Sequence, residues 1–200
     1  MVKRQQQNST RSSARKLCAA AGVDQLILLT DSKRLPDPVV AVKWLPPASM
    51  VILRDYDSAE RLALAIKLRR ACRKADCWFL VAGDAQLAYR VRADGLHLPE
   101  HMLTGKRAQR RGFQFITAAC HSRRALRLAA SAGVDLALVS PVFATASHPD
   151  AAALGTRGLS RMIARAKIPV AALGGIDHRT AKSLRGQNIK AIAAISALKI

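Results

Sequence analysis

The 200-residue chain is half hydrophobic and 23% charged, which excludes wholesale disorder and predicts one packed domain. Its 33 Lys and Arg residues against 13 Asp and Glu residues give a net charge of +20, which favours anionic partners such as phosphorylated small molecules or nucleic acid. Aromatic residues make up only 4%, too few for a protein that stacks single-stranded bases, and no uncharged apolar run approaches the ~18 residues that cross a bilayer.

The chain begins with a basic segment, residues 1–25, that has no acid before Asp24. We expect a frayed start followed by a short helix around Arg15–Ala21. Residues 26–200 are predicted to form the single folded domain.

From residue 26 onward, short apolar runs alternate with longer helical patterns, which predicts a parallel sheet built from βα units. The runs are continuous Val, Ile, Leu and Ala, as in strands that are buried on both faces. The eight predicted strands are Leu26–Thr30, Met50–Arg54, Trp78–Val81, Gly95–Leu98, Phe113–Ala119, Leu136–Ser140, Val170–Leu173 and Ala191–Ile195.

Helical segments with charge on one side lie between these strands. Two of them start at a serine that can cap the first turn, Ser58 and Ser122. The predicted helices are Ser58–Lys74, Gln86–Arg92, Gly105–Arg111, Ser122–Ala132, Ser160–Lys167 and Thr180–Leu184.

Eight strands separated by helices in 200 residues predict an α/β fold, a compact (β/α)₈ TIM barrel. The alternative is an open doubly wound sheet, but no G-x-G-x-x-G follows the first strand to support it. The sequence ends soon after Ser196, so the final helix of the barrel is predicted to be truncated. Either the N-terminal helix covers that edge or a second subunit does, in a homodimer.

The four cysteines form no C-x-x-C pair and have no zinc spacing. We expect them to be buried thiols in a reducing compartment, which predicts a cytoplasmic protein.

The carboxyl ends of the last two strands point to a phosphate site. Gly174-Gly175 follows the seventh strand, and Ile195-Ser196 ends the eighth. Exposed backbone N–H groups at this part of a barrel mouth commonly bind phosphate. A tight turn at the two glycines is the alternative explanation.

Five segments of the chain resemble the thiamine-phosphate synthase family and its relative, thiazole tautomerase. They are Arg92–Pro99, Ala119–Ser122, Ala132–Thr145, Ile168–Ile176 and Ala194–Ala197, and the resemblance covers roughly residues 26–198. It implies a barrel enzyme of thiamine biosynthesis whose substrates are a thiazole phosphate and an aminopyrimidine pyrophosphate. By the same resemblance, Arg54 would hold the pyrophosphate, and the glycine pair with Ile195 and Ser196 would hold the phosphate.

The resemblance is uneven at the metal site. The two aspartates that bind Mg²⁺ in the synthases fall on Gly83 and Met102, and a thioether does not replace a hard carboxylate. Asp84 and Glu100 are close enough in sequence to act as weak Mg²⁺ ligands, so a Mg²⁺ requirement stays open.

The loop after the sixth strand keeps hydroxyl groups at Thr145 and Ser147, while His148 replaces the family's lysine. In the tautomerase branch, the histidine that matches His121 transfers a proton on the thiazole ring. An imidazole suits that role near neutral pH.

Four functions therefore compete. A synthase-like transferase is the leading hypothesis, and a tautomerase-like proton-transfer enzyme is the second. A non-catalytic phosphate binder and a basic, nucleic-acid-associated protein are the others; the arginines recur all around the predicted outer helices, which makes nucleic acid the less favoured partner.

Overall fold

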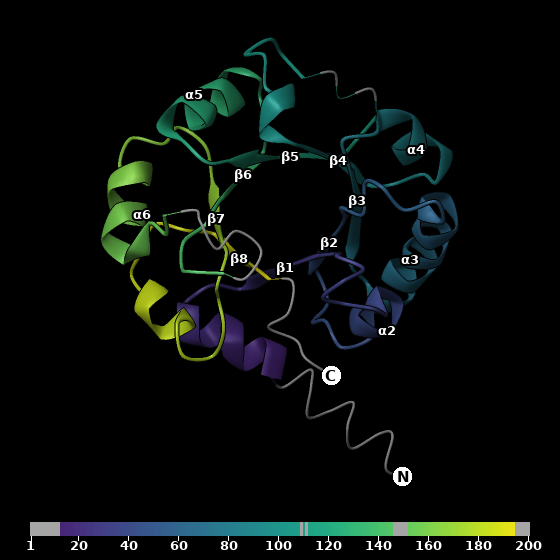
Figure 1. Ribbon diagram of the computed structural model, residues 1–200, viewed down its shortest axis with the longest axis horizontal. Coiled ribbons are helices and arrows are strands. Elements are labelled where there is room, and N and C mark those ends of the chain that lie inside the picture. Colours follow the sequence, from purple (N-terminus) through teal and green to yellow (C-terminus); the bar gives the residue numbers. More distant parts are fainter. Residues whose placement is uncertain (1–12, 109, 111, 146–151, 195–200) are drawn as a thin grey trace.

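The computed structural model describes residues 13–108, 110, 112–145 and 152–194. Eight parallel strands follow one another around a closed barrel, with helices on the outside (Figure 1). The strands are β1 (Gln25–Leu29), β2 (Met50–Leu53), β3 (Trp78–Ala82), β4 (Gly95–Leu98), β5 (Phe115–Cys120), β6 (Leu136–Val139), β7 (Val170–Leu173) and β8 (Ala191–Ala194). The predicted (β/α)₈ fold is confirmed, and each predicted strand lies within two residues of an observed one.

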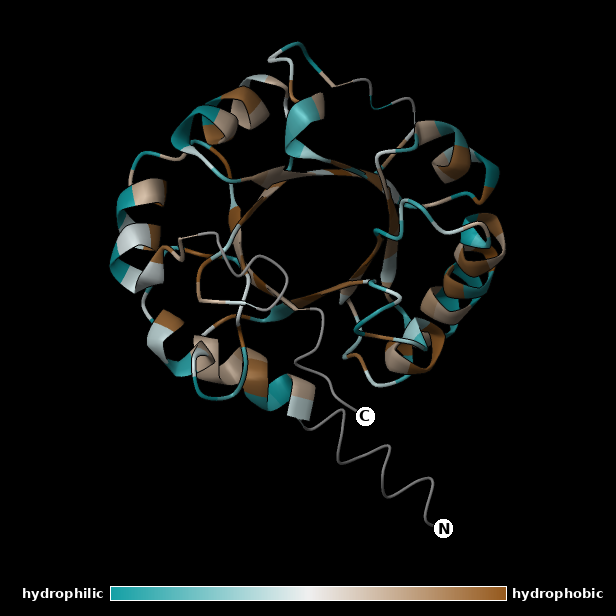
Figure 2. Cartoon of the chain, viewed as in Figure 1, coloured by the Kyte–Doolittle hydropathy of each residue, from teal (hydrophilic) through white to brown (hydrophobic). Residues whose placement is uncertain are grey.

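Alternate residues of most strands fill two separate hydrophobic layers. Ile27, Leu29 and Leu80 belong to the cluster inside the barrel. Leu28 and Val81 belong to the larger cluster between the strands and the helices. Both faces are thus buried, which explains why the strands are continuously apolar in sequence. In Figure 2 the strands are largely brown, and the helices carry teal on their outer sides.

The helices between the strands differ in length. They are α2 (Pro38–Val42), α3 (Arg61–Ala75), α4 (Ala85–Arg90), α5 (Arg123–Ser131), α6 (Gly155–Ile163) and the short 3₁₀ turns η1 (Glu100–Met102) and η2 (Ala181–Leu184). Ser122 caps α5 as predicted, because its hydroxyl accepts the Ala125 N–H at 3.0 Å.

Three helix predictions need correction, and one helix was missed. The predicted helix Ser160–Lys167 is α6, which begins five residues earlier, at Gly155, and ends at Ile163. Ser58 is not the cap of α3, which begins at Arg61 after Glu60 and has no side-chain cap. The predicted helix Gly105–Arg111 is a loop in its described residues, since Gly105 takes a left-handed φ of 74° and Ala108 N–H bonds to the end of α5. The missed helix, α2, has a local signal: Asp37 caps it, and Pro38 occupies its first position.

A helical segment, residues 13–21, lies outside the barrel beside β8 and β1 (Figure 1). Its Leu17 and Ala21 join the same buried cluster as Leu28 and Ile192 of those strands. This segment therefore covers apolar surface at the junction where the barrel closes. The predicted truncated helix after β8 falls on residues 195–200, outside the described residues. No helix in the described part of the chain is long and apolar enough to cross a membrane.

Candidate active site

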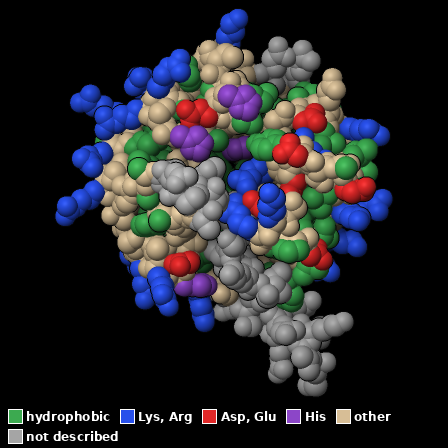
Figure 3. Space-filling view, viewed as in Figure 1, with side chains coloured by type: hydrophobic (Ala, Val, Ile, Leu, Met, Phe, Trp, Pro, Cys, Tyr) green, Lys and Arg blue, Asp and Glu red, His purple; other side chains and the backbone are tan. Residues whose placement is uncertain are grey.

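A cavity of about 1680 Å³ opens at the carboxyl ends of the strands. Its walls come from residues that follow β1, β2, β4, β5, β6 and β7, and from Ala193 and Ala194 at the end of β8. Figure 3 shows histidine, Lys and Arg side chains gathered near the centre of this face. The carboxyl end is the face on which barrel enzymes build their active sites.

The structure brings most of the described candidate residues into this one cavity. Arg54, Glu100, His121, Thr145, Gly174 and Gly175 line it. Asp84 is not among the lining residues. The other candidates, Ser147, His148, Ile195 and Ser196, lie outside the described residues.

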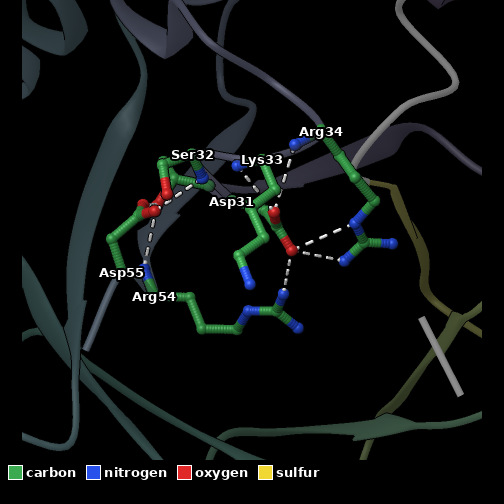
Figure 4. A network of polar contacts seen from close by, with 7 residues as sticks. Asp31, Ser32, Lys33, Arg34, Arg54 and Asp55 are labelled. Carbon is green, nitrogen blue, oxygen red and sulfur yellow. Dashed lines mark hydrogen bonds and ion pairs between the residues drawn. The ribbon is translucent and has the colours of Figure 1, made fainter. Parts of the chain in front are cut away.

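Arg54 belongs to a charged cluster that the sequence did not reveal. Its Nη2 donates to Asp31 Oδ2 at 2.6 Å, and Arg34 donates to the same oxygen from Nε at 3.0 Å and from Nη2 at 2.7 Å (Figure 4). Burial raises the pKa of Asp31, but the hydrogen bonds and charge of Arg34 and the charge of Arg54 outweigh it. The pKa of Asp31 therefore lies below its ordinary value.

The backbone fixes the Asp31 carboxylate as well. The N–H groups of Lys33 and Arg34 both donate to its Oδ1 at 3.2 Å. A second acid fastens this loop to β2, because the Ser32 N–H donates to Asp55 Oδ1 at 2.6 Å and the Thr30 hydroxyl donates to Asp55 Oδ2. The cluster is thus held from both strands.

His121 is oriented by the strand next to it. Its Nδ1 lies 2.9 Å from the carbonyl oxygen of Ser140 and 3.2 Å from the Ser140 hydroxyl. A carbonyl can only accept, so in the neutral ring Nδ1 carries the proton and Nε2 keeps its lone pair. The geometry prepares Nε2 to accept a proton from a molecule in the cavity.

His97 lies at the floor of the cavity and is almost completely buried. Its Nδ1 makes a hydrogen bond of 2.8 Å with the Thr117 hydroxyl on the neighbouring strand. Burial, followed by the charges of Arg54 and His121, lowers the pKa of His97 to about 4. The ring is therefore neutral at physiological pH.

The Gly174–Gly175 turn is packed against the loop after β6. The N–H groups of Val142 and Phe143 donate to the carbonyls of Leu173 and Gly174. Gly175 has a left-handed φ of 62°, and a Cβ there would lie 2.4 Å from the Ala144 carbonyl oxygen. A side chain at position 175 would strain the fold as well as fill the cavity.

The two acids near the family's Mg²⁺ site both make hydrogen bonds within the protein. Asp84 accepts the Leu87 N–H at 2.9 Å, where it caps α4, and it pairs with Arg61 at 3.5 Å. Glu100 accepts the His121 N–H at 2.5 Å and lies 3.5 Å from the Ser122 hydroxyl. With Gly83 and Met102 supplying no hard oxygen, the described residues do not fit a Mg²⁺ site of the synthase type.

Comparison with known proteins gives the barrel a family. Residues 30–198 match the family model described as "Thiamine monophosphate synthase". A protein of Aquifex aeolicus (strain VF5), designated provisionally as thiamine-phosphate synthase 2, is 34% identical over 74% of this chain and 81% of its own length. The thiamine-phosphate synthase of Methanococcus maripaludis (strain DSM 14266) is 28% identical over 86% of this chain and 84% of its own.

The likeness extends to a solved structure. The thiamine phosphate pyrophosphorylase from Pyrococcus furiosus superimposes with a TM-score of 0.67 and is 25% identical in sequence. The superposition covers 90% of this chain and 88% of that protein. These findings favour neither a non-catalytic binder nor a nucleic-acid-associated protein. Because the family match runs from the end of β1 through β8, the chain belongs to the thiamine monophosphate synthase family.

Proposed function

We propose that this protein is a transferase of thiamine biosynthesis that joins a thiazole phosphate to an aminopyrimidine diphosphate. The observation that carries this proposal is that one cavity contains both the Gly174–Gly175 turn and two arginines, Arg34 after β1 and Arg54 after β2. The phosphate of the thiazole and the diphosphate of the pyrimidine would then bind at separate positions within one cavity.

In the proposed reaction, the thiazole nitrogen attacks the methylene carbon of the pyrimidine. The carbon–oxygen bond to the diphosphate breaks, and the diphosphate leaves with the bonding electron pair. Arg54 would stabilise the charge on the leaving group, since oriented guanidinium groups act most strongly where charge develops. The backbone at Gly174 and Gly175, with Thr145, Ser147, His148, Ile195 and Ser196, would anchor the phosphate of the thiazole.

A second candidate function rests on His121. Its Nδ1 contact with Ser140 leaves Nε2 as the basic atom of the neutral ring in the cavity. A base so placed can move a proton between two ring positions of a bound thiazole phosphate, which is isomerase chemistry. Cys120, beside it, cannot compete as the base, because burial, and the charge of Glu100 after it, raise the pKa of that thiol to about 12.

One assay separates the two candidates. Thiamine phosphate formation is measured from both substrates, with Mg²⁺ and with EDTA, beside a family synthase as the positive control. Product formation supports the transferase. Isomerisation of a thiazole phosphate without thiamine phosphate formation would replace it with the second candidate.

The His121→Asn variant tests the proton-transfer role directly. Asn can still donate to the Ser140 carbonyl but does not titrate near neutral pH, so an isomerisation rate should fall roughly 10²–10⁴-fold while phosphate binding changes little. The measurement is a pH–rate profile, with His178→Asn as the control because His178 contacts Ser13, outside the cavity. A profile that keeps its acid limb in the His121→Asn variant would assign the base to another residue.

A further inference from the structure

Three cations from two strand ends surround the Asp31 carboxylate. Lys33, Arg34 and Arg54 all line the cavity, and Figure 4 shows their cationic ends on one side of Asp31. We propose that these three residues form a diphosphate subsite that binds its ligand without a divalent cation. The proposal rests on the proposed function above and names the residues that replace the missing metal ligands.

The first support is the way the guanidinium groups are held. Two guanidinium groups repel each other, but here both donate to one oxygen, Asp31 Oδ2. That oxygen belongs to a carboxylate fixed by two backbone N–H groups. An arginine held in this way loses little conformational freedom when an anion binds, and Arg54 keeps further N–H donors beyond the single one it gives to Asp31.

The second support is the chemistry of the donors. Hard carboxylates for Mg²⁺ are lacking at positions 83 and 102, and Asp84 and Glu100 are engaged in bonds within the protein. Guanidinium groups supply the same positive charge in a fixed fork that matches phosphate oxygens. A diphosphate bound here therefore meets positive charge from the protein itself, in the place where the synthases use a metal.

The acids of the cluster do not cancel this field. Asp31 and Asp55 offset two of the three positive charges, so one positive charge remains. Asp55 turns both of its oxygens toward Thr30 and Ser32 of the loop and not toward the arginines. The Arg54 and Arg34 side chains are only 28% and 23% exposed, so salt screens their pull on an anion less than it would at the open surface.

Asp31 acts through the arginines and is a positioning residue. In Asp31→Asn the loss of a negative charge should strengthen the binding of every anion, whereas the two guanidinium groups are no longer drawn together. The ratio of pyrophosphate to phosphate affinity should therefore fall in this variant. A purely structural role would leave that ratio unchanged.

The test is titration calorimetry of the full chain with inorganic pyrophosphate and with inorganic phosphate, each in EDTA and in Mg²⁺. We expect pyrophosphate to bind in EDTA and to bind little more tightly in Mg²⁺. Arg34→Gln should weaken pyrophosphate binding about tenfold or more, because it removes charge-assisted hydrogen bonds. Arg34→Lys should recover part of the affinity, and Arg124→Gln, on the exposed face of α5, should change nothing.

Thermal unfolding of each variant accompanies the titrations, so that lost binding is not mistaken for lost fold. Pyrophosphate binding that needs Mg²⁺, or that survives Arg34→Gln unchanged, overturns the subsite. Thiamine phosphate synthesis that proceeds only with Mg²⁺ would refute the subsite while leaving the proposed function intact. Metal-free pyrophosphate binding without synthesis would support the subsite and count against the proposed function.

Discussion

Burial fixes the charge state of His97, and that has a consequence for stability. The pKa of His97 falls from an ordinary 6.5 to about 4 through burial and the nearby charges of Arg54 and His121. Between these two values the unfolded chain binds more protons than the folded protein. The free energy of unfolding should therefore drop as the pH falls through this window and hold steady above it.

The measurement is a series of urea unfolding curves from pH 7 down to pH 4, for the natural sequence and for His97→Gln. Gln can keep a hydrogen bond to Thr117 but does not titrate there, so its curves should lose much of the acid-dependent fall. If both proteins lost stability in parallel, other groups would govern the acid response.

At the scale of the loops, Gly175 shows why binding and folding cannot be separated by one bulky substitution. A bulky side chain at position 175, as in Gly175→Val, would fill the proposed phosphate site. In the structure, however, even a Cβ would lie 2.4 Å from the Ala144 carbonyl oxygen and 2.8 Å from the Phe143 Cβ. The residue supports the loop after β6 as well as the cavity.

Gly175→Ala should therefore destabilise the protein by clearly more than Gly133→Ala. Both glycines have left-handed φ, 62° and 71°, but a Cβ at Gly133 meets nothing within 4 Å. The backbone strain alone costs about 1–2 kcal/mol, and the clash at position 175 adds to it. Denaturant unfolding of the two variants measures the difference, and equal losses would mean that the β6 loop yields freely.

Asp84 gives the corresponding prediction for a helix start. Since its carboxylate caps α4, Asp84→Ala should cost about 1 kcal/mol of stability, whereas Asp84→Asn, which preserves an acceptor, should cost less. Neither substitution should alter the response of the enzyme to Mg²⁺. A changed Mg²⁺ dependence in Asp84→Asn would place this carboxylate at a metal after all.

The strands and loops also show which parts of the structure can be predicted from the sequence. The strands were predictable because burial on both faces leaves continuous apolar runs, and the cavity followed because barrel sites lie at carboxyl ends. The Asp31–Arg54 contact was not predictable, since it joins residues 23 positions apart in the segments that follow β1 and β2 and depends on side-chain direction. The loop at 105–108 was mistaken for a helix because its charges repeat at helical spacing while Gly105 breaks the backbone pattern.

Over the whole molecule, positively charged side chains far outnumber negatively charged ones. The net charge is +20, and Lys and Arg side chains project around the rim beside α5 and α6 (Figure 3). Some acids in the described part of the chain form ion pairs, such as Asp94 with Arg69 at 2.6 Å. These pairs act over short distances and are partly buried. Most of the surface charge therefore acts as long-range repulsion, which destabilises a compact state.

Added sodium chloride should consequently stabilise the fold. Raising the salt from about 0.01 M to about 0.1 M shortens the screening length from about 30 Å to about 10 Å, which weakens repulsion across the molecule more than it weakens short ion pairs. The melting temperature should rise over this range.

The same salt series on a double variant, Arg124→Glu with Arg127→Glu, should show a smaller rise, because two exposed positive charges on α5 become negative. A melting temperature that falls with salt in the natural sequence would mean that the short ion pairs, and not the surplus of positive charge, dominate its electrostatics.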